Sequence, residues 1–420
     1  MSKLISVGEI SNYKKGYAFK SKDYASEGVP IVKVSDFGDH TVSKSSTNLN
    51  YEVSEGFEDW KLKKNDILIA TVGSWATNPN SVVGKVVYVE DGLNNALLNQ
   101  NCVRLRTIEG YDQKFLFYSL KTSNFSNHCV SSAQGSANQA SITLDDINLF
   151  KIPNYSLMKQ KRISNFLSDI DNKIILNQQM NETLEEIAKT LFKSWFIDFD
   201  PVIANSEGSS TGLSKDISDL FPDTFESSEI GEIPKGWKLL TFGDFVKPTR
   251  GKVITKKKTD PGSVPVVAGG LEPAYFHSTA NVQGPVVTIS ASGANAGYVN
   301  LYHQDIWASD CSYISNNQTS NVFTSYIFLK INQRRIFESQ HGAAQPHVYP
   351  DDLKRLHMVS PDKDLFSIYE NLVTPFFNKI KLNKDQSDKL ISLRDILLPK
   401  LISGELMVSE IESLTEEASV

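Results

Sequence analysis

Residues that could carry catalysis are present, but they do not form the motifs of two common enzyme classes. The chain lacks GxxxxGK[ST] and HExxH, which argues against a P-loop ATPase and a zinc protease of that type. Cys102, Cys129 and Cys311 are widely spaced and form no CxxC pair, so a zinc ribbon is excluded and reduced thiols are expected. His341 and His347 lack a second pair of ligands, so no metal site is predicted.

Short strings in the sequence partly resemble the motifs of two classes of DNA-acting enzyme, adenine methylases and nucleases. An adenine methylase needs a D/N-P-P-Y/F pocket, which Asn78-Pro79-Asn80 and Pro153-Asn154-Tyr155 do not supply. Pro350-Asp351 and Asp352-Leu353-Lys354 are reminiscent of a PD…(D/E)xK nuclease, but the two elements abut and fit the start of a helix better. We therefore predict a binding protein that is not itself an enzyme. The alternative is a DNA methylase or nuclease with a cryptic active site.

Length and charge set broad limits on the class of protein. A chain of 420 residues suggests about three domains, and its 40% hydrophobic and 22% charged residues are ordinary for a globular protein. It has no run of about 18 apolar residues and no leader-like N-terminus, so we expect a cytoplasmic location. The net charge is −6, but residues 198–231 carry −7 and residues 404–420 carry −5. The remainder is therefore basic, at +6, which is compatible with an anionic partner such as DNA.

The chain is predicted to be an internal duplication. Residues 172–178 and 378–384 match at five of seven positions with an offset of 206, which also pairs Gln139 with Gln345 and residues 145–146 with 351–352. An offset of 235 relates the front parts and pairs Val29-Pro30-Ile31-Val32 with Val264-Pro265-Val266-Val267. Ordered matches at both ends of two units are not expected by chance.

Each repeat is expected to hold a mixed globule followed by a long helix. The front parts contain short β-type runs separated by Gly, Ser and Asn, whereas the back parts change to helical periodicity. The fold class is therefore mixed α+β, with two α/β globules in pseudo-twofold repeat. We predict a first globule at 1–155, a first long helix at 156–200, an acidic linker at 201–231, a second globule at 232–361, a second long helix at 362–403 and an acidic tail at 404–420.

The two helices are predicted to pair as an antiparallel coiled coil. One seam of the first helix runs through positions 163, 170, 177, 184 and 191, and a second through 166, 173, 180, 187 and 194. The second helix repeats both seams, with polar interruptions at matching places, Asn177 with Asn383 and Lys173 with Lys379. Pro375 is expected to break or kink the second helix. Two unpaired amphipathic surface helices are the alternative.

Several strings resemble the specificity subunit of type I restriction-modification systems. Glu232-Ile233-Pro234-Lys235-Gly236-Trp237-Lys238 is similar to the lead into that family's second target-recognition domain. Residues 158–163 resemble the opening of its first helix, residues 191–199 the end of that helix, and residues 397–406 its C-terminal ending. The second helix opens with Leu365-Phe366-Ser367-Ile368 and departs from the family's Gln-x-x-Ile form. The resemblance covers nearly the whole chain.

The resemblance implies that each globule recognises one half of a bipartite, asymmetric double-stranded DNA target. It further implies partners: two modification (methyltransferase) subunits that bind S-adenosylmethionine, and restriction (motor-nuclease) subunits that use ATP and Mg. No cofactor is expected on this chain. A helical scaffold that does not bind DNA is a further alternative, and a salt-dependent band shift would separate it from a DNA-binding subunit.

Candidate DNA contacts are amides, hydroxyls, aromatic and basic groups in predicted loops, because such groups meet base edges and phosphates. In the first globule they are Lys14, Lys15, Tyr17, Ser74, Trp75, Asn78, Asn80, Gln134, Ser136, Asn138 and Gln139. In the second they are Lys247, Arg250, Lys252, Lys256, Lys257, Lys258, Ser292, Asn295, His341, Gln345 and His347. The lysines could equally be solvated surface charges, the paired Gln139 and Gln345 could hold their loops, and Trp75 could be a core anchor. The run 256–258 is the strongest phosphate candidate.

Overall fold

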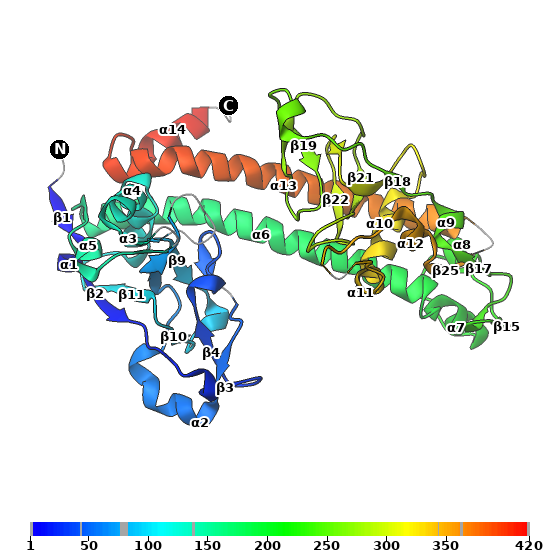
Figure 1. The fold of residues 1–420 in the computed structure, drawn as a ribbon, viewed down its shortest axis with the longest axis horizontal. Coiled ribbons are helices and arrows are strands. Elements are labelled where there is room, and N and C mark those ends of the chain that lie inside the picture. Colours follow the sequence, from blue (N-terminus) through cyan, green and yellow to red (C-terminus); the bar gives the residue numbers. More distant parts are fainter. Residues whose placement is uncertain are drawn as a thin grey trace. The chain divides into compact units, whose positions relative to one another are not determined.

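The computed structural model describes residues 3–42, 44–75, 83–136, 139–342, 344–361 and 364–417 (Figure 1). The chain divides into two compact units, Met1–Ile175 with Ser387–Val420, and Leu176–Gln386. Each unit holds one globule and a stretch of both long helices, α6 (Leu157–Phe196) and α13 (Leu365–Ser403). The mixed α+β class predicted from the sequence is confirmed.

The first globule is built on a five-stranded sheet in the order β2-β11-β7-β9-β5. Its strands are β2 (Ser11–Lys15), β11 (Cys102–Thr107), β7 (Ile67–Ala70), β9 (Val86–Val89) and β5 (Thr41–Val42). All four residues of β7 are buried, as expected for an apolar strand in the centre of a sheet. A second sheet has the order β10-β4-β6-β3, with β10 (Leu97–Leu98), β4 (Val29–Val32), β6 (Asn48–Leu49) and β3 (Tyr24–Ala25).

Helices complete the first globule. They are α1 (Val7–Ile10), α2 (Tyr51–Ser54), α3 (Gln113–Leu120), α4 (Ser123–Ser132) and α5 (Leu144–Asn148). Helix α3 buries six of its eight residues, and its aromatic side chains join the core formed by α1, the main sheet and the ends of the long helices. The side chain of Asp112 caps α3 by accepting a hydrogen bond from Phe115 N at 2.8 Å.

The second globule repeats this architecture with fewer residues. Its main sheet has the order β18-β24-β21-β22, and a smaller sheet has the order β20-β19-β23. The strands are β18 (Thr249–Arg250), β24 (Cys311–Ser315), β21 (Val286–Ser290), β22 (Val299–Tyr302), β20 (Tyr275–His277), β19 (Val264–Val267) and β23 (Trp307–Ala308). The helices are α9 (Phe242–Phe245), α10 (Val322–Ile331), α11 (Gln333–Glu338) and α12 (Pro350–Lys354).

Strand pairing at the base of each globule confirms the duplication. Strand β1 (Leu4–Ser6) pairs with β14 (Lys151–Pro153) in the first globule, and β17 (Lys238–Thr241) pairs with β25 (His357–Ser360) in the second. Both pairings are antiparallel and follow the two sequence offsets. The parallel pairs β4–β10 and β19–β23 also correspond. The two globules therefore share the same strand topology in these pairs.

The long helices run antiparallel within each unit. In the second unit, Asn177 Nδ2 donates to Gln386 Oε1 at 3.0 Å, and Tyr369 Oη donates to the carbonyl of Ala188 at 2.7 Å. Residue numbers therefore rise along α6 as they fall along α13. In the first unit, Arg394 Nη1 pairs with Asp171 Oδ1 at 2.8 Å and Tyr155 Oη, just before α6, donates to the carbonyl of Ile402 at 3.1 Å, so the helices run antiparallel there too. The predicted pairing is confirmed in both units.

Only one of the two predicted seams is buried. Ile163, Ile170 and Asn177 lie in the helix interface as expected, with Asn177 1% exposed. The second seam is wrong, because Lys173 is exposed and Ile187 is 42% exposed. Positions 167, 174, 188 and 195 are buried in its place, since each helix packs against its partner and also against a globule. The polar pair Lys173 and Lys379 faces solvent.

Pro375 does not end the second helix, and α13 continues through it. Its missing N–H costs one backbone hydrogen bond, while the neighbouring Val373 and Phe377 are fully buried and hold the segment. Glu370 of α13 stabilises the start of α10, accepting hydrogen bonds from Phe323 N at 3.0 Å and Thr324 N at 2.7 Å. This contact fixes the second globule to its helix.

The two acidic segments contain regular structure. Residues 201–231 include most of α7 (Asp200–Ser206), α8 (Lys215–Ser218) and β15 (Phe225–Ser228), which pairs with β16 (Gly231–Pro234). Phe221 of this segment is buried in the core of the second unit. Helix α14 (Val408–Glu417) follows α13. Among the described residues, no helix is long and apolar enough to cross a bilayer.

Candidate nucleic-acid interface

The lysine run of the second globule lies on an anchored segment with free side chains. Lys256, Lys257 and Lys258 form the short 3-10 helix η6 and are all exposed. The backbone before them is held in place, because Trp307 Nε1 donates to the carbonyl of Lys252 at 2.8 Å and Ile254 N donates to Ser309 Oγ at 3.2 Å. An anchored backbone with exposed ammonium groups suits phosphate contact. Lys247 and Lys252 are exposed as well.

Two loops that are far apart in the sequence, one around Ser292 and one around His347, contact each other in the second globule. His341 and His347 exchange backbone hydrogen bonds of 2.9 Å, and Ser292 forms a β-bridge with His347. Gly293 N donates to the carbonyl of Pro346 at 3.0 Å. The structure thereby gathers Ser292, His341 and His347 of the predicted set, with the exposed Gln345 in the same loop. Asn295 is half-buried in the turn that follows Ser292.

Asp352 has a structural role that agrees with the predicted helix start. It begins α12 by accepting a hydrogen bond from Tyr349 N at 2.8 Å on Oδ2, while its Oδ1 lies 2.9 Å from His341 Nε2. In the first globule Asp146 caps α5 in the same way through Thr143 N at 2.7 Å. Both Asp352 oxygens are engaged by the fold, which gives no support to a nuclease motif here.

Asp310 is a member of this edge that sequence reasoning missed. Its Oδ1 lies 2.5 Å from Arg250 Nη2, and its Oδ2 accepts a hydrogen bond from Ser292 Oγ. Arg250 and Ser292 were predicted as contacts, but nothing in the sequence relates either of them to position 310. Its role depends on side-chain contacts with residues 60 and 18 positions away, which leave no local signal in the sequence.

In the first globule, the predicted polar residues gather on a small sheet. Strands β12 (Gln134–Ser136), β13 (Gln139–Ser141) and β8 (Val72–Gly73) pair in the order β12-β13-β8. Trp75 Nε1 donates to the carbonyl of Ser136 at 2.8 Å, and the ring packs on the core. Trp75 is therefore an anchor, while Gln134, Ser136 and Gln139 are exposed. Ser74 is half-buried, and Asn78, Asn80 and Asn138 lie outside the described residues.

Lys14, Lys15 and Tyr17 form another group, around Trp60. Lys14 Nζ lies 4.1 Å from the centre of the Trp60 ring and 3.0 Å from Asp59 Oδ2. Trp60 Nε1 donates to the carbonyl of Lys15 at 3.0 Å, and Tyr17 packs on Phe57 with ring centres 4.7 Å apart. The Lys15 side chain is exposed and Tyr17 is 38% exposed. Sequence reasoning missed Trp60, which ends the 3-10 helix Glu55–Trp60 and whose local sequence gave no sign of this contact.

Two other lysines are half-buried and donate hydrogen bonds to backbone carbonyl groups. Lys121 Nζ donates to the carbonyl of Asp39 at 2.6 Å, and burial lowers the pKa of this lysine to about 8. Lys330 Nζ donates to the carbonyl of Val299 at 3.3 Å, and burial lowers its pKa too. These lysines support the fold and are not placed to bind phosphate.

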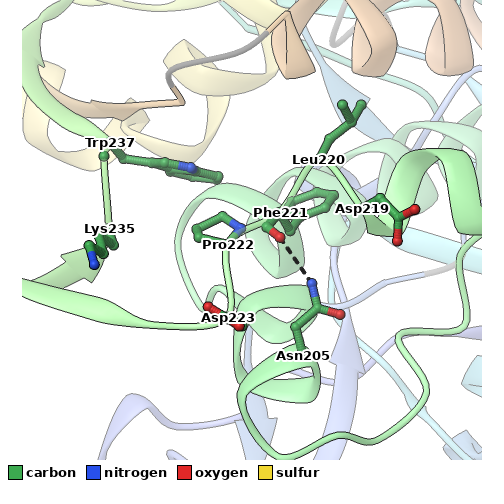
Figure 2. Close-up of a pocket in the computed structure, with 9 residues that line it drawn as sticks. Asn205, Asp219, Leu220, Phe221, Pro222, Asp223, Lys235 and Trp237 are labelled. Atoms are coloured by element: carbon green, nitrogen blue, oxygen red, sulfur yellow. Dashed lines mark hydrogen bonds between the residues drawn. The ribbon is translucent and has the colours of Figure 1, made fainter.

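An open cleft of about 560 Å³ lies in the second unit, between the turn at residues 219–223 and the strand leading to Trp237 (Figure 2). Asn205 holds the turn by donating from Nδ2 to the carbonyl of Phe221 at 3.1 Å. Asp219 and Asp223 are exposed, so the charge at this cleft does not favour DNA. Within the described ranges, no group of three or more His, Cys, Asp or Glu could hold a metal ion.

Comparison with known proteins identifies the family. The chain matches the type I restriction modification DNA specificity domain over residues 2–186 and again over residues 234–390. It belongs to this family and carries its domain twice, which confirms the resemblance noted in the sequence.

Individual relatives extend over most of the chain. The type I restriction enzyme MjaIX specificity subunit of Methanocaldococcus jannaschii is 24% identical over 437 residues, which cover 98% of this chain and 94% of that protein. The HindI specificity subunit of Haemophilus influenzae is 23% identical, over 82% of this chain and 87% of that protein. The crystal structure of a type I restriction-modification S subunit from M. genitalium has a similar fold, with a TM-score of 0.54 at 17% identity, and covers 95% of this chain and 96% of that one.

Proposed function

We propose that this chain is the DNA-specificity subunit of a type I restriction-modification complex, and that each globule binds one half of a bipartite, asymmetric target. The observation that carries the proposal is a duplicated scaffold whose exposed groups differ between the copies. The strand pairs at the base of each globule correspond, whereas the loop edges hold amides and hydroxyls in the first globule and histidines with Arg250 in the second. Two globules with different exposed groups imply two different half-sites in the DNA target.

The long helices are proposed to carry the modification subunits, two for each chain. Large apolar side chains stay exposed on them, with Leu382 61% and Ile396 59% exposed. Such groups on an already paired helix are available to a partner helix. Restriction subunits would join the same assembly in the cytoplasm. S-adenosylmethionine, ATP and Mg would bind to these partners, while this chain supplies recognition only.

The rival function is a DNA methylase or nuclease with a cryptic site on this chain. The two proposals differ in an assay of the isolated chain for S-adenosylmethionine binding, which we expect to be negative. The positive test is to express the chain with its modification subunit and to map methylated adenines across a genome. One bipartite motif, lost when this chain is omitted, is the expected result. Methylation by this chain alone, or methylation without a motif, would contradict the proposal.

A further inference from the structure

Arg250 is an exposed arginine whose direction is set by the fold. It ends the edge strand β18, where it pairs in register with Ser312 of β24. Its Nη2 lies 2.5 Å from Asp310 Oδ1, and its side chain is 39% exposed. Within the part of the chain that the structure describes, Asp310 is its only side-chain partner. A guanidinium has five N–H donors, so this pairing leaves most of them available.

Two other paired arginines, Arg106 and Arg394, are used differently. Arg106 donates from Nε and Nη2 to both oxygens of Asp66, at 2.5 and 2.7 Å, and Asp66 is 3% exposed. Arg394 is buried against Asp171 and Asp395. These side chains use their planar donor groups inside the fold. Arg250 differs because one oxygen of the partly exposed Asp310 carboxylate orients it, while its side chain is 39% exposed and forms no other side-chain hydrogen bond among the described residues.

Asp310 is itself fixed in position. Its second oxygen accepts a hydrogen bond from Ser292 Oγ, and its backbone carbonyl accepts one from Ala291 N at 3.2 Å. Ser292 in turn bridges His347, so the guanidinium stands beside the loop edge that gathers the histidines. Arg250 also lies two residues before Lys252 and six before the lysine run. The oriented guanidinium therefore lies close in the sequence to the lysine run that is predicted to contact phosphate.

We propose that Arg250 reads a guanine in the half-site of the second globule, and that Asp310 and Ser292 are positioning residues for it. The inference rests on the proposed DNA-binding function. Guanine presents N7 and O6 side by side in the major groove, and arginine is the residue that donates to both at once. The carboxylate neutralises part of the guanidinium charge, which disfavours indiscriminate phosphate binding and keeps the fork in one orientation.

The first globule lacks this arrangement at the corresponding positions. Gly16 N donates to the carbonyl of Cys102, as Gly251 N does to that of Cys311, so Lys15 corresponds to Arg250. By the same backbone correspondence, Asn101 replaces Asp310 and Val72 replaces Ser292. Lysine has no fork, and neither asparagine nor valine can orient it as a carboxylate and hydroxyl do. The guanine contact is therefore specific to the second half-site.

The test uses the full complex of this chain with its modification subunit, bound to duplexes that carry its mapped target. Each guanine of the second half-site is replaced in turn by 7-deazaguanine, which lacks the N7 acceptor. For the wild-type complex, one of these replacements should weaken binding about 5- to 150-fold. In complexes with Arg250→Gln or Arg250→Lys, that same replacement should have little further effect, because these side chains no longer make the bidentate interaction with guanine.

Asp310→Asn and Ser292→Ala should relax the base requirement at the same base pair and at no other, and Ser292→Thr should retain it. A residue with a purely structural role would weaken binding to every sequence alike. Arg334→Gln is the matched control, since Arg334 pairs with Glu338 on an exposed helix surface and is 91% exposed.

Two results would overturn the inference while leaving the proposed function intact. One is a wild-type complex with a defined motif in which no guanine of the second half-site is sensitive to 7-deaza replacement, a result that does not depend on any variant folding. The other is an Arg250→Gln complex with an unchanged motif. A wild-type complex without any motif would instead reject the proposed function itself.

Discussion

At the scale of single residues, the cationic groups of the second globule serve two different purposes. Lys330 is turned inward to a backbone carbonyl and its pKa is lowered by burial. Lys256, Lys257 and Lys258 are exposed on a segment whose backbone is held by the smaller sheet. The first kind contributes to the fold, and the second kind is available to an anion. Substitution of each kind should therefore have different consequences.

Replacing all three lysines of the run by alanine should weaken DNA binding without changing the target sequence. Phosphate contacts add affinity that carries no sequence information, and the removal of one lysine–phosphate pair should lower the logarithmic salt slope by up to about 0.9. Titrations at several salt concentrations, with specific and unrelated duplexes, measure both effects. Unchanged affinity and slope would make the run a solvated surface, and a changed motif would place these lysines at base edges.

His303 should make the stability of the second unit sensitive to acid. Burial lowers the pKa of this histidine to about 4, and Lys384 and Lys381 act in the same direction. In the unfolded chain the imidazole takes up its proton near pH 6.5, so between about pH 6.5 and 4 the unfolded state binds the extra proton. Stability is therefore lost as the pH falls through this window, by up to about 1.4 kcal/mol per pH unit from this one group.

Denaturant unfolding at about pH 7.5 and about pH 5 measures this loss. His303→Gln should reduce the difference in unfolding free energy between the two pH values. His357→Gln is a suitable control because His357 is exposed. An equal acid sensitivity in the wild type and in His303→Gln would refute the assignment.

Residue type and local spacing predicted part of this picture from the sequence alone. The exposed lysine run, the loop histidines and the helix start at Asp352 were all accessible, because each depends on neighbours within a few residues. Asp310 and Trp60 were not, since their roles depend on contacts 60 and 45 residues away with Arg250 and Lys15. Side-chain contacts between distant loops have no local sequence signal.

At the scale of elements, polar groups inside the helix pair fix its register. Asn177 and Asn383 are each 1% exposed, and Asn383 Nδ2 donates to Asn181 Oδ1 at 2.8 Å. In the first unit, Asp171 binds Arg394 and also accepts a hydrogen bond from Tyr118 Oη at 2.6 Å, which joins α3 to both long helices. Buried polar groups of this kind specify alignment at some cost in stability.

Arg394→Met should strongly destabilise the first unit. It leaves the Asp171 carboxylate, whose side chain is 6% exposed, without its cationic partner, and such a change costs about 3–5 kcal/mol. Arg334→Met breaks an exposed pair and should cost less than about 1 kcal/mol. Denaturant unfolding of the two variants compares these values. Similar losses in both would show that the Asp171–Arg394 pair has no special role.

The length of the helices is predicted to set the distance between the two half-sites. Four residues inserted at matching places near Asn177 and Asn383 add about one turn, or roughly 5 to 6 Å. At about 3.4 Å per base pair, the non-specific spacer of the target should lengthen by one or two base pairs. Methylation mapping of the insertion variant gives the spacer directly. Retained activity with the original spacer would show that another feature sets the distance.

Sequence periodicity identified these helices and their pairing but not their second buried face. A heptad pattern assumes that each helix packs on one partner, so it placed Lys173 and Ile187 in the interface. The structure instead buries Ala188 and Trp195, because a globule also packs along each helix. Packing against a globule cannot be read from the periodicity of the helix itself.

At the scale of the whole molecule, the chain contains two copies of one structural scaffold. The base strands, the parallel pair of the smaller sheet and the acidic caps at Asp146 and Asp352 occur in both globules. The exposed loop groups do not repeat. A duplicated scaffold with independent loops should allow the DNA-contacting loops of one globule to change while those of the other stay the same. This independence of the two globules is the central claim about function.

Exchanging the first globule, residues 1–155, for that of another family member tests this claim most directly. The chimera is expressed with its modification subunit, and methylated adenines are mapped across the genome beside those of the parent. We predict that one half-site changes to that of the donor, while the other half-site and the spacer length stay the same. A change in both half-sites, or no change in either, would contradict the account.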